Sequence, residues 1–193
     1  VRGYFGGHDS NGWDYANSPL QTGSTFKIMT LAAALQQGIS LDTNYSSAPY
    51  QLPGSDVVTN VGGGCGVCNL REATKQSLNT SFLRLQEDLK NGTQDTADMA
   101  HALGVAKSLP GIEKTLTENG KQPFEGIVLG QYQSRPLDMA TAMSTLANQG
   151  VWHNPHFVQR VENAAGEVLY EHPEDEGERR VSSNVANNVI EAM

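Results

Sequence analysis

One junction in the chain sets the start of an apolar helix. There Ser18-Pro19-Leu20-Gln21-Thr22-Gly23-Ser24-Thr25-Phe26-Lys27 runs directly into Ile28-Met29-Thr30-Leu31-Ala32-Ala33-Ala34-Leu35-Gln36-Gln37. The second segment is rich in good helix formers, and Gly38 follows as a stop signal, so we expect a helix over residues 23–37. A lysine three residues after a serine lies on the same helix face, so the amine of Lys27 can reach the oxygen of Ser24.

This spacing suggests a nucleophile and its base. If burial or a neighbouring charge lowers the pKa of Lys27, its amine can take the hydroxyl proton of Ser24. The alternative is a capped, solvated helix start, which is common and which the four-residue pattern alone does not exclude. Phe26 and the aliphatic run favour the catalytic interpretation, because they place Lys27 at the foot of an apolar helix.

A second short motif, Ser77-Leu78-Asn79, lies within the segment that runs from Leu70 to Phe82. Serine and asparagine prefer caps and turns, so one interpretation is a plain junction between two helices. Opposite Ser24, however, Ser77 could relay a proton between Lys27 and a leaving amine. Asn79 could orient Lys27 and a substrate amide, and the two motifs together are far more specific than either alone.

The two motifs resemble the S-x-x-K and S-x-N patterns of penicillin-binding proteins and serine β-lactamases. The resemblance covers nearly all 193 residues. It is strongest to the transpeptidase domain of bifunctional class A penicillin-binding proteins of actinobacteria, whose glycosyltransferase domain lies outside this chain. The segments that carry it are Tyr4–Asp9, Thr22–Lys27, Glu72–Phe82, Gly126–Tyr132, Pro136–Ala140 and Leu146–Val151.

The resemblance implies an α/β fold of the penicillin-binding/serine β-lactamase type, in which helices flank an antiparallel sheet beside an all-helical subdomain. Residues 1–193 would then form one transpeptidase domain fragment. The family's third motif, Lys-Thr/Ser-Gly, is absent, and Met193 falls inside a helix that begins near Ser182 or Ser183. We therefore expect a domain that is incomplete at both ends and inactive by itself. The remainder of the domain, present as a separate chain, is one candidate partner.

The activity implied is that of a peptidoglycan D,D-transpeptidase. In this resemblance Ser24, Lys27, Ser77 and Asn79 are the catalytic residues, stem peptides are the substrates, and β-lactams acylate the same serine. The chemistry is nucleophilic catalysis with an oxyanion hole, so no metal and no organic cofactor is expected.

Three alternatives use the same residues differently. A D,D-carboxypeptidase or serine β-lactamase would send water to the acyl-enzyme, and a β-lactam sensor domain would acylate without cross-linking anything. In a non-catalytic scaffold both motifs would be helix caps, which the presence of both motifs and of Pro136–Ala140 disfavours.

Composition agrees with an extracytoplasmic domain. The net charge is −8 and basic residues do not cluster, which argues against nucleic acid as a partner. No run approaches the ~20 apolar residues of a membrane span, and no signal peptide is recognisable. The family implies a place on the outer face of the bacterial membrane, held by an N-terminal anchor outside these residues.

The two cysteines, in Cys65-Gly66-Val67-Cys68, are expected to form a short-range disulfide in a loop near the active site. The glycines before them do not form the apolar strand that a thioredoxin-like site requires, and a closed zinc site needs four ligands. A similar Cys-x-x-Cys insertion occurs in the actinobacterial relatives. His153 and His156 flank Pro155, which indicates a turn instead of a metal pair.

Elsewhere hydrophobic patterning predicts further elements. We expect helices at about 70–76, 80–90, 95–104 and 136–149, the last with Pro136 in its first turn. Strands are expected near residues 1–6, at 50–53 and 57–61, and as a hairpin of 157–163 and 167–171 joined by 164–166.

Overall fold

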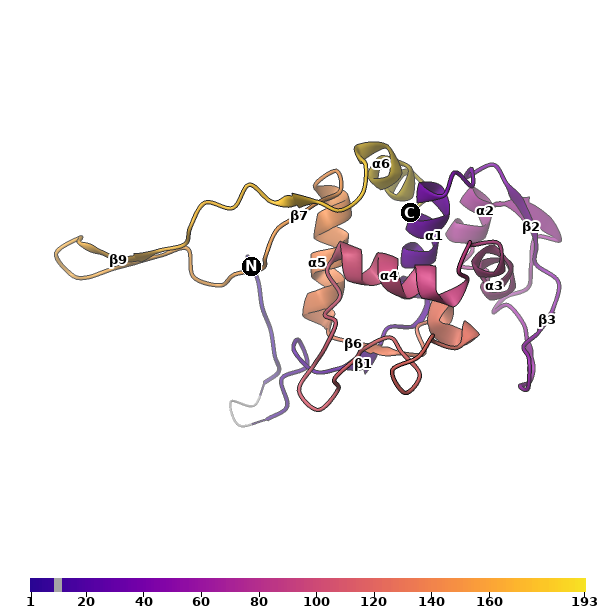
Figure 1. The fold of residues 1–193 in the computed structure, drawn as a ribbon, viewed down its shortest axis with the longest axis horizontal. Helices are drawn as coiled ribbons and strands as arrows, with labels where there is room; N and C mark the ends of the chain where they lie inside the picture. The colour runs from indigo at the N-terminus through magenta and orange to yellow at the C-terminus, as the bar shows by residue number, and fades with distance from the viewer. Residues whose placement is uncertain (9–11) are drawn as a thin grey trace.

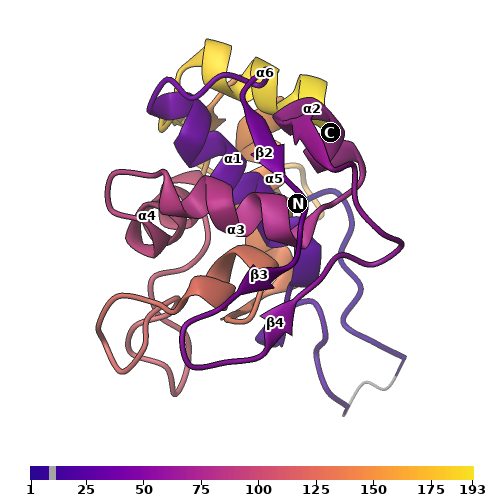
Figure 2. The ribbon, with the colours of Figure 1, turned by 90° about the vertical axis from the view of Figure 1, so that its right-hand side faces the viewer.

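A computed structural model describes residues 1–8 and 12–193 and shows a helical body with a projecting arm (Figure 1). Helix α1 lies inside the body and packs against α3, α4 and α6, while α5 packs against α4 and α6. Figure 2 shows α6 beside α1 and α2 at one end of this body. The α-helices are α1 (Lys27–Gln36), α2 (Leu70–Lys75), α3 (Asn79–Glu87), α4 (Thr93–Leu103), α5 (Pro136–Ala147) and α6 (Ser183–Ala192).

Helix α1 is buried on all sides because its sequence is apolar on all sides. Every residue from Lys27 to Ala34 is buried, and the three consecutive alanines let neighbouring helices approach closely. Its one buried hydroxyl, on Thr30, lies 3.1 Å from the hydroxyl of Thr96, which in turn donates to Gln86 Oε1 at 3.1 Å. The buried hydroxyl of Thr30 therefore has a hydrogen-bond partner, as buried polar groups require.

The strands within the described residues form five separate two-stranded antiparallel pairs. The pair β8–β9 is a hairpin that extends away from the helical body, at the left of Figure 1, and its residues are exposed on both faces. The pairs are β1 (Leu20–Gln21) with β6 (Gln133–Ser134), β2 (Asn44–Ser46) with β5 (Val67–Asn69), β3 (Tyr50–Gln51) with β4 (Val57–Val58), β7 (Val151–Trp152) with β10 (Glu178–Arg179), and β8 (Arg160–Glu162) with β9 (Val168–Glu171).

The predicted helices are confirmed, with ends that differ by a few residues. The active-site helix begins as a 3₁₀ turn, η1 (Gly23–Phe26), before α1 takes over. A second 3₁₀ helix, η2 (Glu125–Leu129), was not predicted. The hairpin with its turn at 164–166 and the short strands near 50 and 57 are also confirmed.

The strand expected near residues 1–6 is wrong. Residues 1–7 adopt no strand, because a strand is defined by its hydrogen-bonded neighbour and none of the described segments pairs with this one. With the described residues the segment makes no ladder, only isolated hydrogen bonds such as the bond from the backbone N–H of Tyr15 to the carbonyl oxygen of Gly6 at 2.8 Å. Asp9, the last residue of the quoted Tyr4–Asp9 segment, lies outside the described residues.

The burial of α1 predicts an asymmetry between two chemically identical substitutions. Leu31 is fully buried, so Leu31→Ala should lower the free energy of unfolding by about 2–5 kcal/mol through lost apolar contact and a residual cavity. Leu169 in β9 is 63% exposed, and Leu169→Ala should change it by less than about 0.5 kcal/mol. Urea denaturation of both variants measures the difference; equal losses would contradict the packing described for α1.

Candidate active site

The site is built around the amine of Lys27. Ser24 lies in η1 and Lys27 follows it directly, and in a 3₁₀ helix, with three residues per turn, side chains at i and i+3 stand one above the other. The distance from Lys27 Nζ to Ser24 Oγ is 2.9 Å, a hydrogen bond. The first predicted pair is therefore in contact.

The second motif brings three more oxygens to the same amine. Ser77 follows α2 with a left-handed φ of +54°, and both its carbonyl oxygen and its Oγ lie near Lys27 Nζ, at 2.7 and 2.9 Å. Asn79 opens α3, and its Oδ1 lies 2.7 Å from the same nitrogen. All four predicted site residues thus meet at one atom.

The types of these four oxygens matter for the proton balance. The Ser77 carbonyl and Asn79 Oδ1 can only accept, whereas the hydroxyls of Ser24 and Ser77 can also donate. A neutral amine has two N–H groups, which satisfy the two obligate acceptors, and one lone pair, which can accept a hydroxyl proton. The surroundings are suited to a lysine that is neutral when the hydroxyl of Ser24 needs a base.

Burial lowers the pKa of Lys27 to about 8 from its ordinary 10.5, because a charged amine loses its hydration there. Only 2% of the residue is exposed, and the Phe82 ring lies with its centroid 6.0 Å from Nζ. Within residues 1–8 and 12–193, no carboxylate forms an ion pair with this amine to raise the pKa again. Ser24 and Ser77 are both exposed, so a substrate can reach the hydroxyls while the base lies beneath them.

The start of η1 is held by a close approach of two glycines. A Cβ added to Gly130 would lie 2.3 Å from both the N and the O of Gly23. Both glycines also adopt left-handed φ values, +75° and +59°, which favour glycine. The turn after η2 therefore touches the backbone next to Ser24, and only glycine at position 130 allows this.

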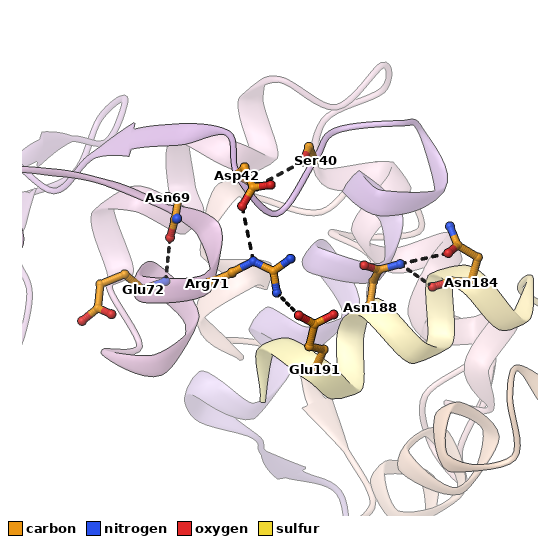
Figure 3. Close-up of polar contacts among 8 residues, drawn as sticks. All are labelled: Ser40, Asp42, Asn69, Arg71, Glu72, Asn184, Asn188 and Glu191. Atoms are coloured by element: carbon orange, nitrogen blue, oxygen red, sulfur yellow. Dashed lines mark hydrogen bonds and ion pairs between the residues drawn. The ribbon is translucent and has the colours of Figure 1, made fainter.

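Helix α2, which ends just before Ser77, is fixed at its other end by polar contacts (Figure 3). Asn69 caps it, since its Oδ1 accepts from the backbone N–H of Glu72 at 3.0 Å. Arg71 contacts Asp42, in the segment after α1, at 3.3 Å, and also pairs with Glu191 of α6. These exposed ion pairs contribute little stability, but they join α2 to two other parts of the body.

Cys65 and Cys68 form the predicted disulfide. It spans the start of β5, where Cys68 is the register partner of Tyr45 in β2. Gly66, between the two cysteines, accepts from the backbone N–H of Ser47 at 2.8 Å. The loop before the disulfide carries Asn60, which binds Thr80, the residue directly after the second motif.

Sequence reasoning found the four polar residues but missed two supports, Gly130 and Asn60. Gly130 lies in a segment that resembles the family, but nothing in the sequence shows that it touches Gly23. Asn60 is twenty residues before its partner Thr80 in an irregular stretch, so no periodicity links them. No sequence signal marks either contact.

Other kinds of site have little support. In the part of the chain that the structure describes, no group of three or more histidine, cysteine or acidic side chains could hold a metal ion. No helix formed by these same residues combines the length and apolarity needed to cross a membrane. His156 stacks on His172 with ring centroids 3.7 Å apart instead of joining His153 as a ligand pair.

The fold and the four-residue cluster are typical of a serine–lysine nucleophilic site, and comparison with known proteins assigns the chain to a family. Residues 7–193 match the penicillin binding protein transpeptidase domain. The chain belongs to this family, and the expected fold class is confirmed by its structural neighbours.

Several of the similar proteins come from mycobacteria. Penicillin-binding protein 1A of Mycolicibacterium smegmatis is 52% identical over 196 residues, which cover 100% of this chain and 25% of that protein. The solved structure of the penicillin-binding protein PonA1 from Mycobacterium tuberculosis has a TM-score of 0.93 at 49% identity, over 98% of this chain and 50% of that one. A penicillin G acyl-enzyme complex of penicillin-binding protein A from M. tuberculosis has a TM-score of 0.81 at 29% identity, over 93% and 44% of the two chains. The chain thus spans about a quarter of the curated relative's length.

The lowered pKa of Lys27 can be measured directly. In protein labelled with ¹³C-lysine, the Cε signal that Lys27→Arg removes should titrate near pH 8. Asn79→Asp places a carboxylate where Oδ1 now lies, and should raise the midpoint by about 1–3 pH units. An unchanged midpoint in Asn79→Asp would contradict the contact between the two residues.

The same pKa shift predicts how stability depends on pH. In the unfolded chain Lys27 stays protonated up to about pH 10.5, so the contribution of Lys27 to stability should increase as pH rises from about 8 to 10.5.

The glycine contact predicts a second, independent effect. Gly130→Ala should destabilise the protein by more than Gly166→Ala, although both positions have a similar left-handed φ, +75° and +83°. Each alanine incurs about 1–2 kcal/mol of backbone strain, but the added Cβ at Gly166 meets nothing within 4 Å, whereas at Gly130 it displaces Gly23. Thermal unfolding compares the two variants. Equal losses would show that the clash is relieved without moving η1.

Proposed function

We propose that these residues form the nucleophile-bearing part of a peptidoglycan D,D-transpeptidase, which works through an acyl-enzyme on Ser24 and is acylated by β-lactams. The observation that carries the proposal is the buried amine of Lys27, hydrogen-bonded to Ser24 Oγ, Ser77 Oγ and Asn79 Oδ1. The family match and the β-lactam complexes solved for its relatives support it.

In the first half-reaction, Lys27 Nζ takes the Ser24 hydroxyl proton as Ser24 Oγ bonds to the carbonyl carbon of the penultimate D-alanine. The C–N bond to the terminal D-alanine then breaks. Ser77 Oγ gives its proton to the leaving nitrogen and is reprotonated from the Lys27 ammonium, 2.9 Å away. Asn79 Oδ1 holds the amine in place throughout.

In the second half-reaction, an amine from a neighbouring stem peptide attacks the acyl carbon and the ester bond to Ser24 Oγ breaks. The proton that the amine loses is taken by Lys27 Nζ, which returns a proton to Ser24 Oγ, and the new amide bond closes the cross-link. A β-lactam enters the first half-reaction in the same way, but its amine remains part of the acyl group on Ser24 after the ring C–N bond opens. The backbone N–H of Ser24, at the start of η1, is one donor for the oxyanion. In the family the second donor comes from the Lys-Thr/Ser-Gly strand, a motif that these 193 residues do not contain.

The proposed setting is the outer face of a bacterial membrane, with an anchor and a glycosyltransferase domain in the whole protein. The Cys65–Cys68 disulfide supports it, because disulfides persist in oxidising compartments. Stem peptides are the proposed partners there.

The test uses protein that carries the whole transpeptidase domain, exposed to penicillin V and followed by intact mass and peptide mapping. Wild type should gain one adduct on Ser24, and Ser24→Ala should gain none. Lys27→Ala should slow acylation by about 10²–10⁴-fold through loss of the base, while Lys75→Ala, which removes an exposed lysine, should not. Normal labelling of folded Ser24→Ala would overturn the assignment.

The fate of the adduct separates the transpeptidase from its alternatives. An adduct that persists for many minutes, together with transfer of a peptide acyl group to an added D-amino acid, supports cross-linking chemistry. Rapid release to water would indicate a carboxypeptidase or β-lactamase. Stable acylation without any transfer would indicate a sensor.

A further inference from the structure

Two consecutive residues of the loop between β4 and β5, Thr59 and Asn60, contact the last residue of the second motif and the residue after it. The side-chain Nδ2 of Asn79 donates to the carbonyl oxygen of Thr59 at 3.2 Å. Next to it, the backbone N–H of Thr80 donates to Asn60 Oδ1 at 3.0 Å, and Asn60 Nδ2 lies 2.9 Å from Thr80 Oγ1. A segment twenty residues away in sequence thus contacts both residues at the start of α3.

These contacts fix which way the amide of Asn79 faces. The carbonyl oxygen of Thr59 can only accept, so the NH₂ group of Asn79 must face it and Oδ1 must face Lys27. A flipped amide would turn its NH₂ group toward Lys27 Nζ. The lone pair of the neutral amine would then accept from Asn79, and this hydrogen bond would compete with transfer of the Ser24 proton.

The side chain of Asn60, the residue after Thr59, is hydrogen-bonded on two sides. Its own orientation is fixed by a donor-only partner and an acceptor-only partner: Oδ1 faces the N–H of Thr80, and Nδ2 donates to the carbonyl of Ser47 at 2.9 Å. Ser47 is fixed in turn, since its backbone N–H and its hydroxyl both donate to Gly66 O, at 2.8 and 3.1 Å, inside the disulfide loop. Asn60 therefore joins the disulfide end of the loop to the start of α3.

We propose that Asn60 is a positioning residue for the acylation of Ser24: it holds the Thr59 carbonyl against Asn79, so that Asn79 Oδ1, and not its NH₂ group, faces the Lys27 amine. Asn60 reaches Lys27 only through Thr59 and Asn79. The inference rests on the proposed acyl-serine function, and it adds a residue outside both motifs that keeps the base able to accept a proton.

The experiment compares Asn60→Ala with Asn163→Ala in protein that carries the whole transpeptidase domain. Asn163 is a matched control, because its side chain also binds backbone groups, the N–H groups of Ala165 and Glu167, but in the β8–β9 turn away from the helical body. The readouts are the acylation rate constant with penicillin V at saturation, its half-saturating concentration, and the pH dependence of the rate.

Asn60→Ala should lower the saturating rate constant about 10–100-fold, because a misplaced catalytic group loses that much. The half-saturating concentration should stay within about twofold, and the pH at half-maximal rate should rise as water reaches Lys27 through the loosened loop. Asn163→Ala should change none of the three. If Asn60→Ala is too unstable to assay, Asn60→Ser, which keeps a smaller polar group at this position, should show the same changes with smaller magnitude.

Two results would overturn the proposal. One is a folded Asn60→Ala or Asn60→Ser protein with the wild-type saturating rate and pH profile. The other is a loss of rate with an unchanged pH profile that matches the unfolded fraction, which would make Asn60 purely structural. Absence of any penicillin adduct on wild-type protein would instead reject the function on which the inference rests, so the two failures are distinguishable.

Discussion

The site depends on the desolvation of one amine. Lys27 opens a helix whose next seven residues are buried with it, so its Nζ cannot be hydrated as a surface lysine would be. What it meets instead are neutral oxygens from Ser24, Ser77 and Asn79. Hydroxyls and carbonyls satisfy the hydrogen bonds of the amine without stabilising its charge as a carboxylate would, so its pKa is low enough for a base near neutral pH.

Placing those oxygens requires backbone that is not regular. Ser77 adopts a left-handed φ between two helices, which lets both its carbonyl and its hydroxyl face the same amine. Gly130 lies against Gly23 just before Ser24, and Asn60 binds the residue just after Asn79. The precision of the site comes from loops that are held by neighbouring elements, while the helices supply its rigid base.

The parts of the chain differ in how much tertiary contact they need. The β8–β9 hairpin is formed by its own turn, in which Asn163 Oδ1 accepts from two backbone N–H groups, and it projects with both faces exposed. Residues 1–7, by contrast, form no strand, because strand structure depends on a neighbour that no described segment provides. Hydrogen bonds within the turn are sufficient to form the hairpin, whereas residues 1–7 need a neighbouring strand to form one themselves.

The α-helices and the candidate catalytic residues could be predicted without the structure. The run Ile28–Leu35 consists of apolar residues and good helix formers, which predicts a buried helix, and the i, i+3 spacing already places Ser24 beside Lys27. The packing of the folded chain, in contrast, brings Ser77 and Asn79 to the same amine across some fifty residues and places Asn60 and Gly130 against the surrounding loops. Spacing within one helix is fixed by its pitch, whereas contacts between distant loops depend on how the helices pack, which no local pattern encodes.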